Sequence, residues 1–154
     1  MGLMEASSTS SEPTSLTQEN LGFLLAKASQ HWNELLHERF VGRGYGDVRP
    51  AYGSILVPLL EEDGLRIGEL ASRARLAKQT MTTMIRLLER ADLVRRERDP
   101  DDGRASRVYL MARSQRFRAV VQEVLTDLDE LVASRLTANQ RAALPNALKE
   151  VIDL

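Results

Sequence analysis

The chain has no cysteine and only two histidines among its 154 residues. Without cysteine it can form no disulfide framework, no thiolate metal site and no thiol-based redox sensor. Because imidazole ligands are also scarce, a dedicated transition-metal sensor is not expected. We predict neither a metal nor a cofactor.

Long apolar runs are absent as well. No stretch approaches the roughly 20 apolar residues that a membrane-spanning helix needs. The N-terminus reads MGLMEASSTSSEPTSL, which lacks the charged start and apolar core of a secretory signal and is instead rich in Ser and Thr. We therefore expect no membrane partner, a cytoplasmic location and a disordered tail over residues 1–17.

Motifs that carry catalysis are also missing. The sequence has no phosphate-binding glycine loop, no H-E-x-x-H pattern and no recognisable Ser/His/Asp grouping. The acidic run at residues 61–63 precedes Gly64 and is typical of a solvated helix end. We predict that the protein is not an enzyme.

Two helical patterns stand close together in residues 65–91. In each, apolar residues recur at the spacing of a helix that buries one stripe. The first pattern comprises Ile67, Leu70, Ala71 and Ala74, and the second comprises Met81, Met84, Ile85 and Leu88. Only residues 75–77 separate them, as a tight turn between crossed helices requires. The spacing predicts a helix-turn-helix.

The second helix carries a polar face. Its outer residues are Lys78, Gln79, Thr82, Thr83 and Arg86, with Thr80 beside them. Such side chains can bond base edges or phosphates in a major groove, and threonine methyls can contact thymine. The alternative is an ordinary solvated helix face, and the helix by itself does not exclude it.

A predicted hairpin follows the second helix. Residues 94–98 and 107–110 alternate in the manner of two strands, and the turn sequence DPDDGR lies between them. Gly103 and the aspartates suit such a turn, which places Arg104 at the tip. A guanidinium there can enter a narrow minor groove. The alternative is a salt bridge from Arg104 to Asp99, Asp101 or Asp102 that only braces the loop.

The charge of the chain is unevenly distributed. Residues 66–118 hold fourteen Lys and Arg against seven Asp and Glu, a balance of +7, while the remainder holds seven against fifteen, a balance of −8. The whole chain therefore carries a net charge of only −1. A basic module between acidic flanks provides the attraction that a phosphate backbone needs.

The centre of the chain reads GELASRARLAKQTMTTMIRLLERADLVRR, and DPDDGRASRVYL follows it. This segment resembles the DNA-binding module of the MarR family of bacterial transcriptional regulators. The resemblance extends more weakly over residues 20–152. It implies a mainly α fold, a winged helix-turn-helix with a two-stranded β-hairpin wing and flanking dimerisation helices. Its recognition helix maps onto residues 78–91, and its wing arginine onto Arg104. We place a tail at 1–17 and one domain at 18–154, with the module at about 48–112 and dimerisation helices at about 19–42 and 114–153.

Three positions depart from the family pattern. Ala77 replaces the usual polar N-cap, a change that typically costs about 1 kcal/mol, and Thr80 or a neighbouring group is expected to compensate. Asp92 replaces a glycine between helix and wing, and Asp tolerates left-handed geometry better than most residues. After the second strand, we expect Ser114 to cap the next helix.

Three further helical stripes flank the module. They lie within residues 21–40, 117–136 and 137–152, the last opening on a predicted capping box at Thr137. Pro58 and Pro145 are each expected to kink or shorten a helix, and Pro50 suits the first turn of another. The stripes carry more apolar surface than one small module can cover, which favours a homodimer. The alternative is a monomer whose terminal helices fold back.

The resemblance also implies a small aromatic or anionic effector bound between the dimerisation helices and the module. The residues proposed to line its site are His31, Trp32, His37, Arg49 and Tyr52. Each has a simpler interpretation, since Trp32 and Tyr52 also suit a core and either histidine suits the surface.

The combined hypothesis is a sequence-specific DNA-binding regulator, a homodimeric repressor of a pseudo-palindromic double-stranded site that an effector releases. Gln79, Thr82, Thr83 and Arg86 would approach bases, whereas Lys78, Arg95, Arg96 and Arg98 would hold phosphates. The alternative is a winged-helix module that docks on protein.

Overall fold

The computed structural model describes residues 15–154, and this described part forms two compact units, residues 15–32 and 33–154. Most of the predicted tail therefore lies outside the described residues. Residues 15–17 are exposed and belong to no helix or strand. In the first unit Asn20 caps helix α1 (Leu21–Gly42), because its Oδ1 accepts a hydrogen bond from the Gly22 amide at 2.9 Å.

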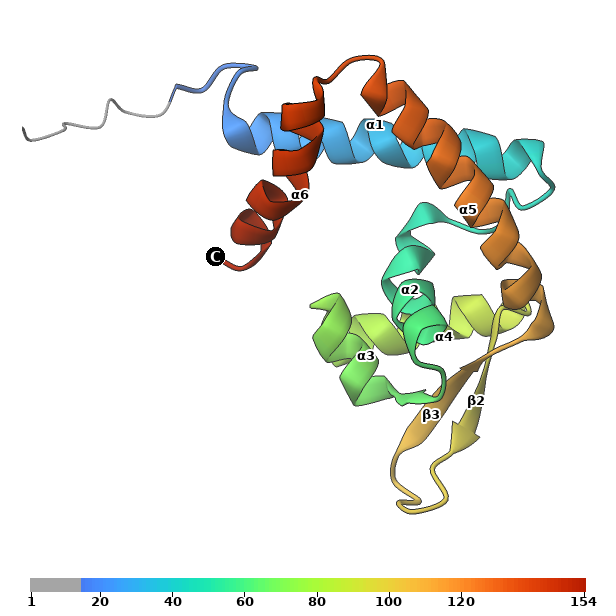
Figure 1. The fold of residues 1–154 in the computed structure, drawn as a ribbon. Coiled ribbons are helices and arrows are strands. Elements are labelled where there is room, and N and C mark those ends of the chain that lie inside the picture. The colour runs from blue at the N-terminus through green and yellow to red at the C-terminus, as the bar shows by residue number, and fades with distance from the viewer. Residues whose placement is uncertain (1–14) are drawn as a thin grey trace, which may run out of the picture. The chain divides into compact units, whose positions relative to one another are not determined.

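The second unit holds the remaining elements (Figure 1). In chain order they are η1 (Pro50–Tyr52), α2 (Gly53–Glu61), β1 (Leu65–Arg66), α3 (Ile67–Ala74), α4 (Lys78–Arg90), β2 (Val94–Arg98), β3 (Ser106–Leu110), α5 (Ala112–Ala133) and α6 (Ala138–Ile152). This is the mainly helical winged fold that the sequence predicts. None of the described helices combines the length and apolar character needed to span a membrane.

Helices α3 and α4 form the helix-turn-helix. Leu70 of α3 packs inside with Met81, Ile85 and Leu88 of α4, and all four side chains are fully buried. Arg75 closes the turn in a left-handed conformation, with φ of 52°. The predicted apolar stripes therefore form the joint between the two helices, and Met84 alone of the second stripe is only half-buried.

The wing belongs to a three-stranded antiparallel sheet with the order β1-β3-β2. Val94 pairs with Leu110 at the base of the hairpin and Arg98 with Ser106 near its tip, and Leu65 of β1 pairs with Val108. In Figure 1 the hairpin projects beyond α2, α3 and α4. The predicted hairpin is thus present, and a two-residue strand that sequence analysis missed fastens it to the start of α3.

The expected helix caps had mixed outcomes. The capping box at Thr137 is present, with Gln140 as its partner. Asp92 adopts the predicted left-handed conformation at φ of 57°. Ser114, however, does not cap α5, because Met111 occupies the N-cap position and Ser114 lies inside the first turn, where its hydroxyl donates to the Leu93 carbonyl at 2.6 Å. That prediction was wrong because a nearby backbone acceptor took the hydroxyl.

One proline, Pro50, fits its helix differently from expectation. Pro50 opens the short helix η1 rather than the first turn of an α-helix. Pro58 and Pro145 each lie inside a continuous helix, α2 and α6, so neither proline ends its helix.

Candidate nucleic-acid interface

The outward face of α4 is open to solvent along its length. Lys78, Gln79, Thr80, Thr83 and Arg86 are exposed and Thr82 is half-buried, whereas Met81, Ile85 and Leu88 fill the core on the other side. Burial of the apolar stripe thus fixes which side chains face outward.

The two central threonines of this face have their hydroxyl protons engaged. Thr82 donates to the Lys78 carbonyl at 2.9 Å, and Thr83 donates to the Gln79 carbonyl at 3.1 Å. Each hydroxyl oxygen keeps lone pairs that can accept a hydrogen bond, and each methyl group remains for apolar contact. Thr83, which is exposed, can therefore contact a thymine methyl more readily than it can donate to a base.

The start of α4 has no side-chain cap. Ala77 occupies the N-cap position and Thr80 forms no capping hydrogen bond, so the compensation expected from Thr80 is absent. The amides of the first helical turn thus lack a side-chain acceptor. Phosphate oxygens are suited to such amides, because the helix dipole also favours negative charge at this end.

The wing tip is shaped by aspartates that bond the backbone. Asp102 Oδ1 accepts from the Arg104 amide at 3.0 Å, and Asp99 Oδ1 accepts from the Asp101 amide at 2.9 Å. These are the predicted Asx-type contacts. Within the described residues the Arg104 guanidinium forms no ion pair, so the alternative of a brace from Arg104 to a wing aspartate is wrong.

Asp99 instead anchors the base of the wing. Its carboxylate is fully buried, and Oδ2 accepts from Arg66 Nε at 2.7 Å and Arg107 Nε at 3.2 Å. Arg107 also donates to the Gly64 carbonyl at 2.9 Å. The Asp101 amide, Arg107 and Arg66 together hold the pKa of Asp99 below its usual range. Sequence analysis missed Arg66 because it lies 33 positions from Asp99, and it placed Arg107 only as a residue of the second strand.

Replacing Asp99 with asparagine is expected to lower the midpoint of thermal unfolding and to weaken duplex binding roughly tenfold, since the wing loses its anchor. Because folding lowers this pKa, the stabilisation is present above the unfolded value of about 3.9 and is lost as pH falls through the folded value. The loss of stability on going to acid pH should therefore be smaller in Asp99→Asn than in the wild type. Asp101→Asn, two residues along the turn and exposed, should behave like the wild type. Equal effects of both variants would refute the role of Asp99 as the anchor.

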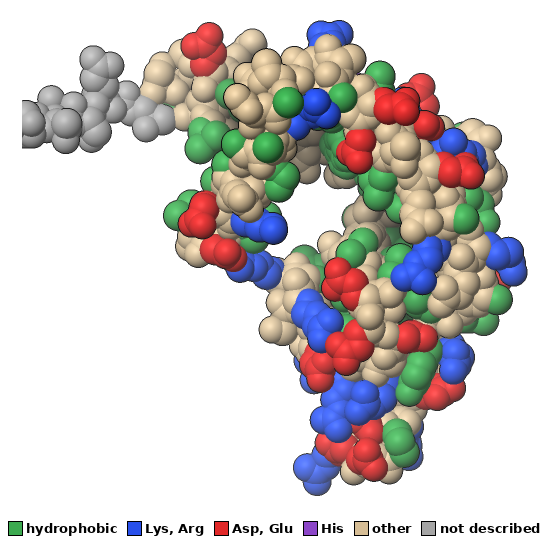
Figure 2. Space-filling view, in the orientation of Figure 1, with side chains coloured by type: hydrophobic (Ala, Val, Ile, Leu, Met, Phe, Trp, Pro, Cys, Tyr) green, Lys and Arg blue, Asp and Glu red, His purple; other side chains and the backbone are tan. Residues whose placement is uncertain are grey.

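The predicted phosphate-binding cations fall into two groups. Arg95 pairs with Glu97 at 2.9 Å and lies 4.8 Å above the Tyr109 ring, and Arg96 pairs with Glu89 of α4 at 2.7 Å. By contrast, Lys78, Arg86, Arg98 and Arg104 form no ion pair within the described residues. Figure 2 shows Lys and Arg gathered over the wing and neighbouring helices at the lower end of the molecule, mixed with Asp and Glu.

A groove of about 520 Å³ separates the wing tip from the helices. Arg104, Asp102 and Ser106 line it from the wing, and Lys78 and Arg66 line it from the helix side. The groove therefore brings Arg104 of the wing and Lys78 of α4 to one open surface, which the carboxylates of Asp102 and Glu69 also line.

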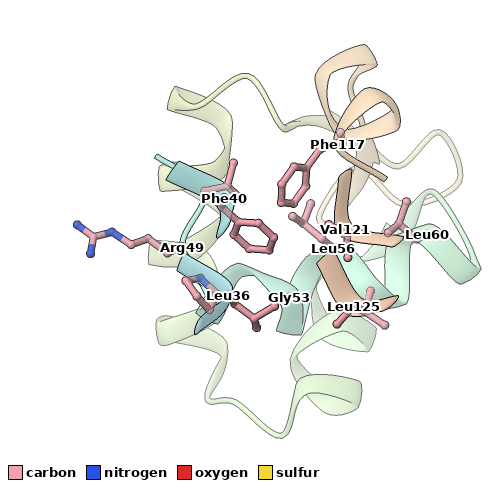
Figure 3. Close-up of a pocket in the computed structure, with 13 residues that line it drawn as sticks. Leu36, Phe40, Arg49, Gly53, Leu56, Leu60, Phe117, Val121 and Leu125 are labelled. Atoms are coloured by element: carbon pink, nitrogen blue, oxygen red, sulfur yellow. The ribbon is translucent and has the colours of Figure 1, made fainter. Parts of the chain in front are cut away.

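A separate cavity of about 150 Å³ lies between the end of α1, α2 and the first half of α5 (Figure 3). Its walls are almost entirely aliphatic and aromatic: Leu36, Phe40, Val48, Pro50, Leu56, Val57, Leu60, Phe117, Val121 and Leu125, with Gly53, Ser114 and Arg49. Figure 3 shows the Arg49 guanidinium directed away from the cavity. The Ser114 hydroxyl is already bonded to Leu93.

Of the predicted effector-site residues, only Arg49 lines this cavity. Tyr52 and His37 are half-buried outside its lining, and Nδ1 of His37 is buried without a hydrogen-bond partner. His31 and Trp32 belong to the first unit, where His31 is exposed and Trp32 half-buried. The cavity is instead built from apolar residues that sequence analysis assigned to helix stripes. Within residues 15–154 no three His, Asp or Glu side chains gather as a metal site would require.

A helix-turn-helix followed by a β-hairpin, with an open helix face and a cation at the hairpin tip, defines the winged helix-turn-helix class. Residues 50–106 match the model of the MarR family. The chain is 32% identical over 93 residues to the HTH-type transcriptional repressor Rv2887 of Mycobacterium tuberculosis. The aligned region covers 60% of this chain and 67% of Rv2887. The chain belongs to the MarR family of transcriptional regulators.

Other similarities agree with this assignment. The chain is 36% identical over 72 residues to the HTH-type transcriptional regulator YsmB of Bacillus subtilis, a match that spans only 47% of each protein. The PcaV regulator of Streptomyces coelicolor, solved with its natural ligand, superposes with a TM-score of 0.76 at 21% identity, covering 90% of this chain and 96% of PcaV. Reduced AbfR bound to DNA gives a TM-score of 0.67 at 20% identity, covering 86% of this chain and 88% of AbfR. These structures share the fold.

Proposed function

We propose that the protein is a sequence-specific regulator that binds double-stranded DNA as a homodimer, represses transcription and is released by a small molecule. The open face of α4 beside an unpaired Arg104 on an anchored wing carries the DNA-binding part of the proposal. The relative AbfR, solved bound to DNA, supports it. The name of the relative Rv2887 as a repressor supports repression.

Each cation of the interface has a distinct role in the proposal. Gln79, Thr83 and Arg86 would approach base edges in the major groove. Thr82 would lie further from the DNA, because it is half-buried. Lys78 and Arg98 would hold phosphates directly, because within the described residues neither has an ion pair that must first break. Arg95 and Arg96 would first have to give up Glu97 and Glu89, so we expect them to contribute less. Arg104 would enter the minor groove.

Salt dependence separates DNA binding from the alternative of docking on protein. The logarithm of the affinity for a labelled duplex should fall linearly with the logarithm of salt concentration, with a slope of about −0.9 for each phosphate neutralised. Four to six phosphate contacts would give a slope of roughly −4 to −5. A slope near zero with weak binding would favour the protein-docking alternative.

Apolar surface on the last two helices supports the homodimer. Leu131 of α5 and Leu144, Leu148 and Ile152 of α6 are exposed, and no residue of α6 is buried. In the described part of the second unit, α6 is tied to the module at its C-terminal end, where Arg75 donates to Asp153 at 2.7 Å. An exposed ion pair of this kind contributes little stability. We infer that a second copy of the chain covers this surface.

The walls of the cavity favour an uncharged, apolar effector. Burial of a carboxylate without a partner is costly, and no unpaired cation points into the cavity. A volume near 150 Å³ with apolar walls suits a single small ring. The relative PcaV, solved with its natural ligand, supports effector binding as such.

Toluene and benzoate provide a matched pair of probes for this idea. Toluene is expected to raise the midpoint of thermal unfolding, whereas benzoate at the same concentration should leave it unchanged. Val121→Phe, which fills part of the cavity, should abolish the toluene shift, and Leu131→Phe on the same helix should retain it. If benzoate instead raises the midpoint of thermal unfolding, and this increase disappears in Arg49→Gln, the effector is an anion held by Arg49.

A further inference from the structure

Helix α4 carries a second stripe of carbon-bearing side chains besides the one that fills the core. Thr80, Thr83, Met84 and Leu87 follow the i, i+3, i+4, i+7 spacing of one helix side. Thr80, Thr83 and Leu87 are exposed and Met84 is half-buried. Leu87 keeps an exposed fraction of 41%, so the core of the module does not bury this side of the helix. We call these four residues the methyl stripe.

The threonine at the centre of the methyl stripe has little use for its hydroxyl proton outside the helix. Thr83 Oγ1 donates to the Gln79 carbonyl at 3.1 Å, one turn earlier, which directs the hydroxyl back along the helix. Thr83 therefore offers a bound molecule its methyl group and the lone pairs of its oxygen. Leu87, four residues further on, offers only carbon.

The methyl stripe lies on the side of α4 that faces away from the wing. Two observations place the wing on the other side. Glu89 pairs with Arg96 of β2 at 2.7 Å, and Lys78 lines the groove that Arg104 of the wing also lines. Lys78 and Glu89 are eleven residues apart, which is close to three full turns, so they share one side of the helix. Residues 80, 83, 84 and 87 fall on the opposite side.

The size and surroundings of the methyl stripe favour DNA over a protein as its occupant. Four side chains of one helix are few against the roughly 20–30 residues a side of a stable protein interface. Gln79 and Arg86 are exposed between the stripe and the wing side, and both suit base edges. The stripe is therefore continuous with the surface proposed to enter the major groove. The C5 methyl group of thymine is the apolar group that base pairs present there.

We propose that the methyl stripe reads C5 methyl groups of pyrimidines, so that the preferred site carries thymine in the part of the major groove furthest from the wing. Thr83 and Leu87 are the specificity-determining residues. This inference rests on the DNA-binding function proposed above. The two residues are separated by about 6 Å along the helix axis, more than the 3.4 Å between base pairs, so each reaches a different base pair. Burial of one methyl group is expected to raise affinity roughly fourfold.

Replacing thymine with uracil tests the proposal, because uracil lacks the methyl group and keeps the base pairing. The wild-type protein first selects its site from random duplexes of about 30 base pairs, long enough for two half-sites one helical turn apart. Each thymine of the selected site is then replaced singly, and the dissociation constant is measured at fixed salt. We expect one or two thymines in each half-site at which uracil weakens binding roughly fourfold. At the same positions, 5-methylcytosine should bind more tightly than cytosine by a similar factor.

Variants of Thr83 separate its methyl group from its hydroxyl. Thr83→Ser keeps the hydroxyl that donates to Gln79, yet it should bind the thymine duplex roughly fourfold more weakly and lose the response to uracil at one position. Thr83→Val keeps a methyl group and should retain both affinity and response. Leu87→Ala should lose the response at the other position. Thr126→Ser is the matched control, because Thr126 is an exposed threonine of α5 whose hydroxyl donates to the Gln122 carbonyl at 2.9 Å. It should change neither quantity.

The outcomes distinguish this proposal from the DNA-binding function on which it rests. If the wild type selects no sequence, the proposed function fails and the methyl readout fails with it. If the wild type selects a site but no thymine responds to uracil, or the responses survive in both Thr83→Ser and Leu87→Ala, DNA binding stands and the methyl readout is overturned. Equal weakening by Thr83→Ser and Thr83→Val would assign the contact to the hydroxyl oxygen and overturn the role of the methyl group. Both residues are exposed, so these substitutions leave the core intact.

Discussion

Replacing Leu148 with glutamate is expected to yield a monomer whose affinity for a duplex with two half-sites is at least a hundredfold below that of the wild type. Leu148 lies on the exposed apolar side of α6, together with Leu144 and Ile152. A carboxylate buried at that contact would lack a partner. Once the dimer separates, the second recognition helix no longer binds at the high effective concentration that linkage provides, a loss of about 10² to 10⁴ in affinity.

Sedimentation equilibrium and a duplex titration on the same samples check this prediction. Lys149→Glu is the matched control, because it alters the neighbouring residue of α6 and changes the charge by more, yet leaves the apolar residues untouched. That variant should remain dimeric. A dimer that survives Leu148→Glu would show that this side of α6 is not the dimer contact. A wild type that sediments as a monomer would favour the alternative in which α6 folds back on its own module.

The second large effect is expected from Arg104→Ala. Removing this guanidinium should weaken duplex binding by about 1–3 kcal/mol, or roughly fivefold to 150-fold, and reduce the slope of the salt dependence by about one. The thermal midpoint and the dimer should be unchanged. The physical reason is that the Asp102 carboxylate bonds the Arg104 backbone amide, which alanine retains, while the guanidinium has no partner within the described residues.

Arg135→Ala is the control for Arg104→Ala, since it removes an exposed cation beyond the end of α5 with the same change in net charge. It should alter duplex affinity less than twofold. Arg104→Lys should recover only part of the loss, because an ammonium lacks the planar fork of the guanidinium. Unchanged affinity in Arg104→Ala would reassign Arg104 to the structure of the loop.

Local patterns in the sequence predicted the helix-turn-helix and the wing well. The spacing of Leu70, Met81, Ile85 and Leu88 identifies the buried stripes because a stable helix must bury its apolar side. Thr137 and Gln140 sit at the spacing of a capping box, and Asp92 stands where a left-handed residue is needed. The buried stripes, the capping box and the left-handed turn each depend on residues that are close together in the sequence, so each can be predicted from the sequence alone.

Contacts between distant segments could not be predicted in the same way. Arg66 and Arg107 reach Asp99 only because β1 pairs with β3. The strand β1 has only two residues, Leu65 and Arg66, which are too few to show a strand pattern in the sequence. Arg96 appears in the sequence as a free cation, yet Glu89 neutralises it across the joint between α4 and β2. Ser114 suited a helix cap until the fold brought the Leu93 carbonyl to it.

The candidate effector site shows the same limit. Sequence reasoning selected aromatic and titratable residues, whereas the cavity is lined by residues such as Leu56 and Val121 that look like ordinary core positions. Whether an apolar stripe packs tightly or leaves a cavity depends on how three helices meet. The sequence pattern of a single helix does not contain that information. Only Arg49 was common to the prediction and the lining.

The central claim is that this protein recognises a particular DNA sequence, and competition between duplexes tests it most directly. We would titrate the protein by fluorescence anisotropy against the duplex upstream of its own gene and against a shuffled duplex of equal length, at one salt concentration near physiological. The account predicts affinity for the native duplex at least about 10³-fold above that for the shuffled one, the usual margin for specific binding. Equal affinity for both duplexes, in a protein shown to be dimeric, would contradict it.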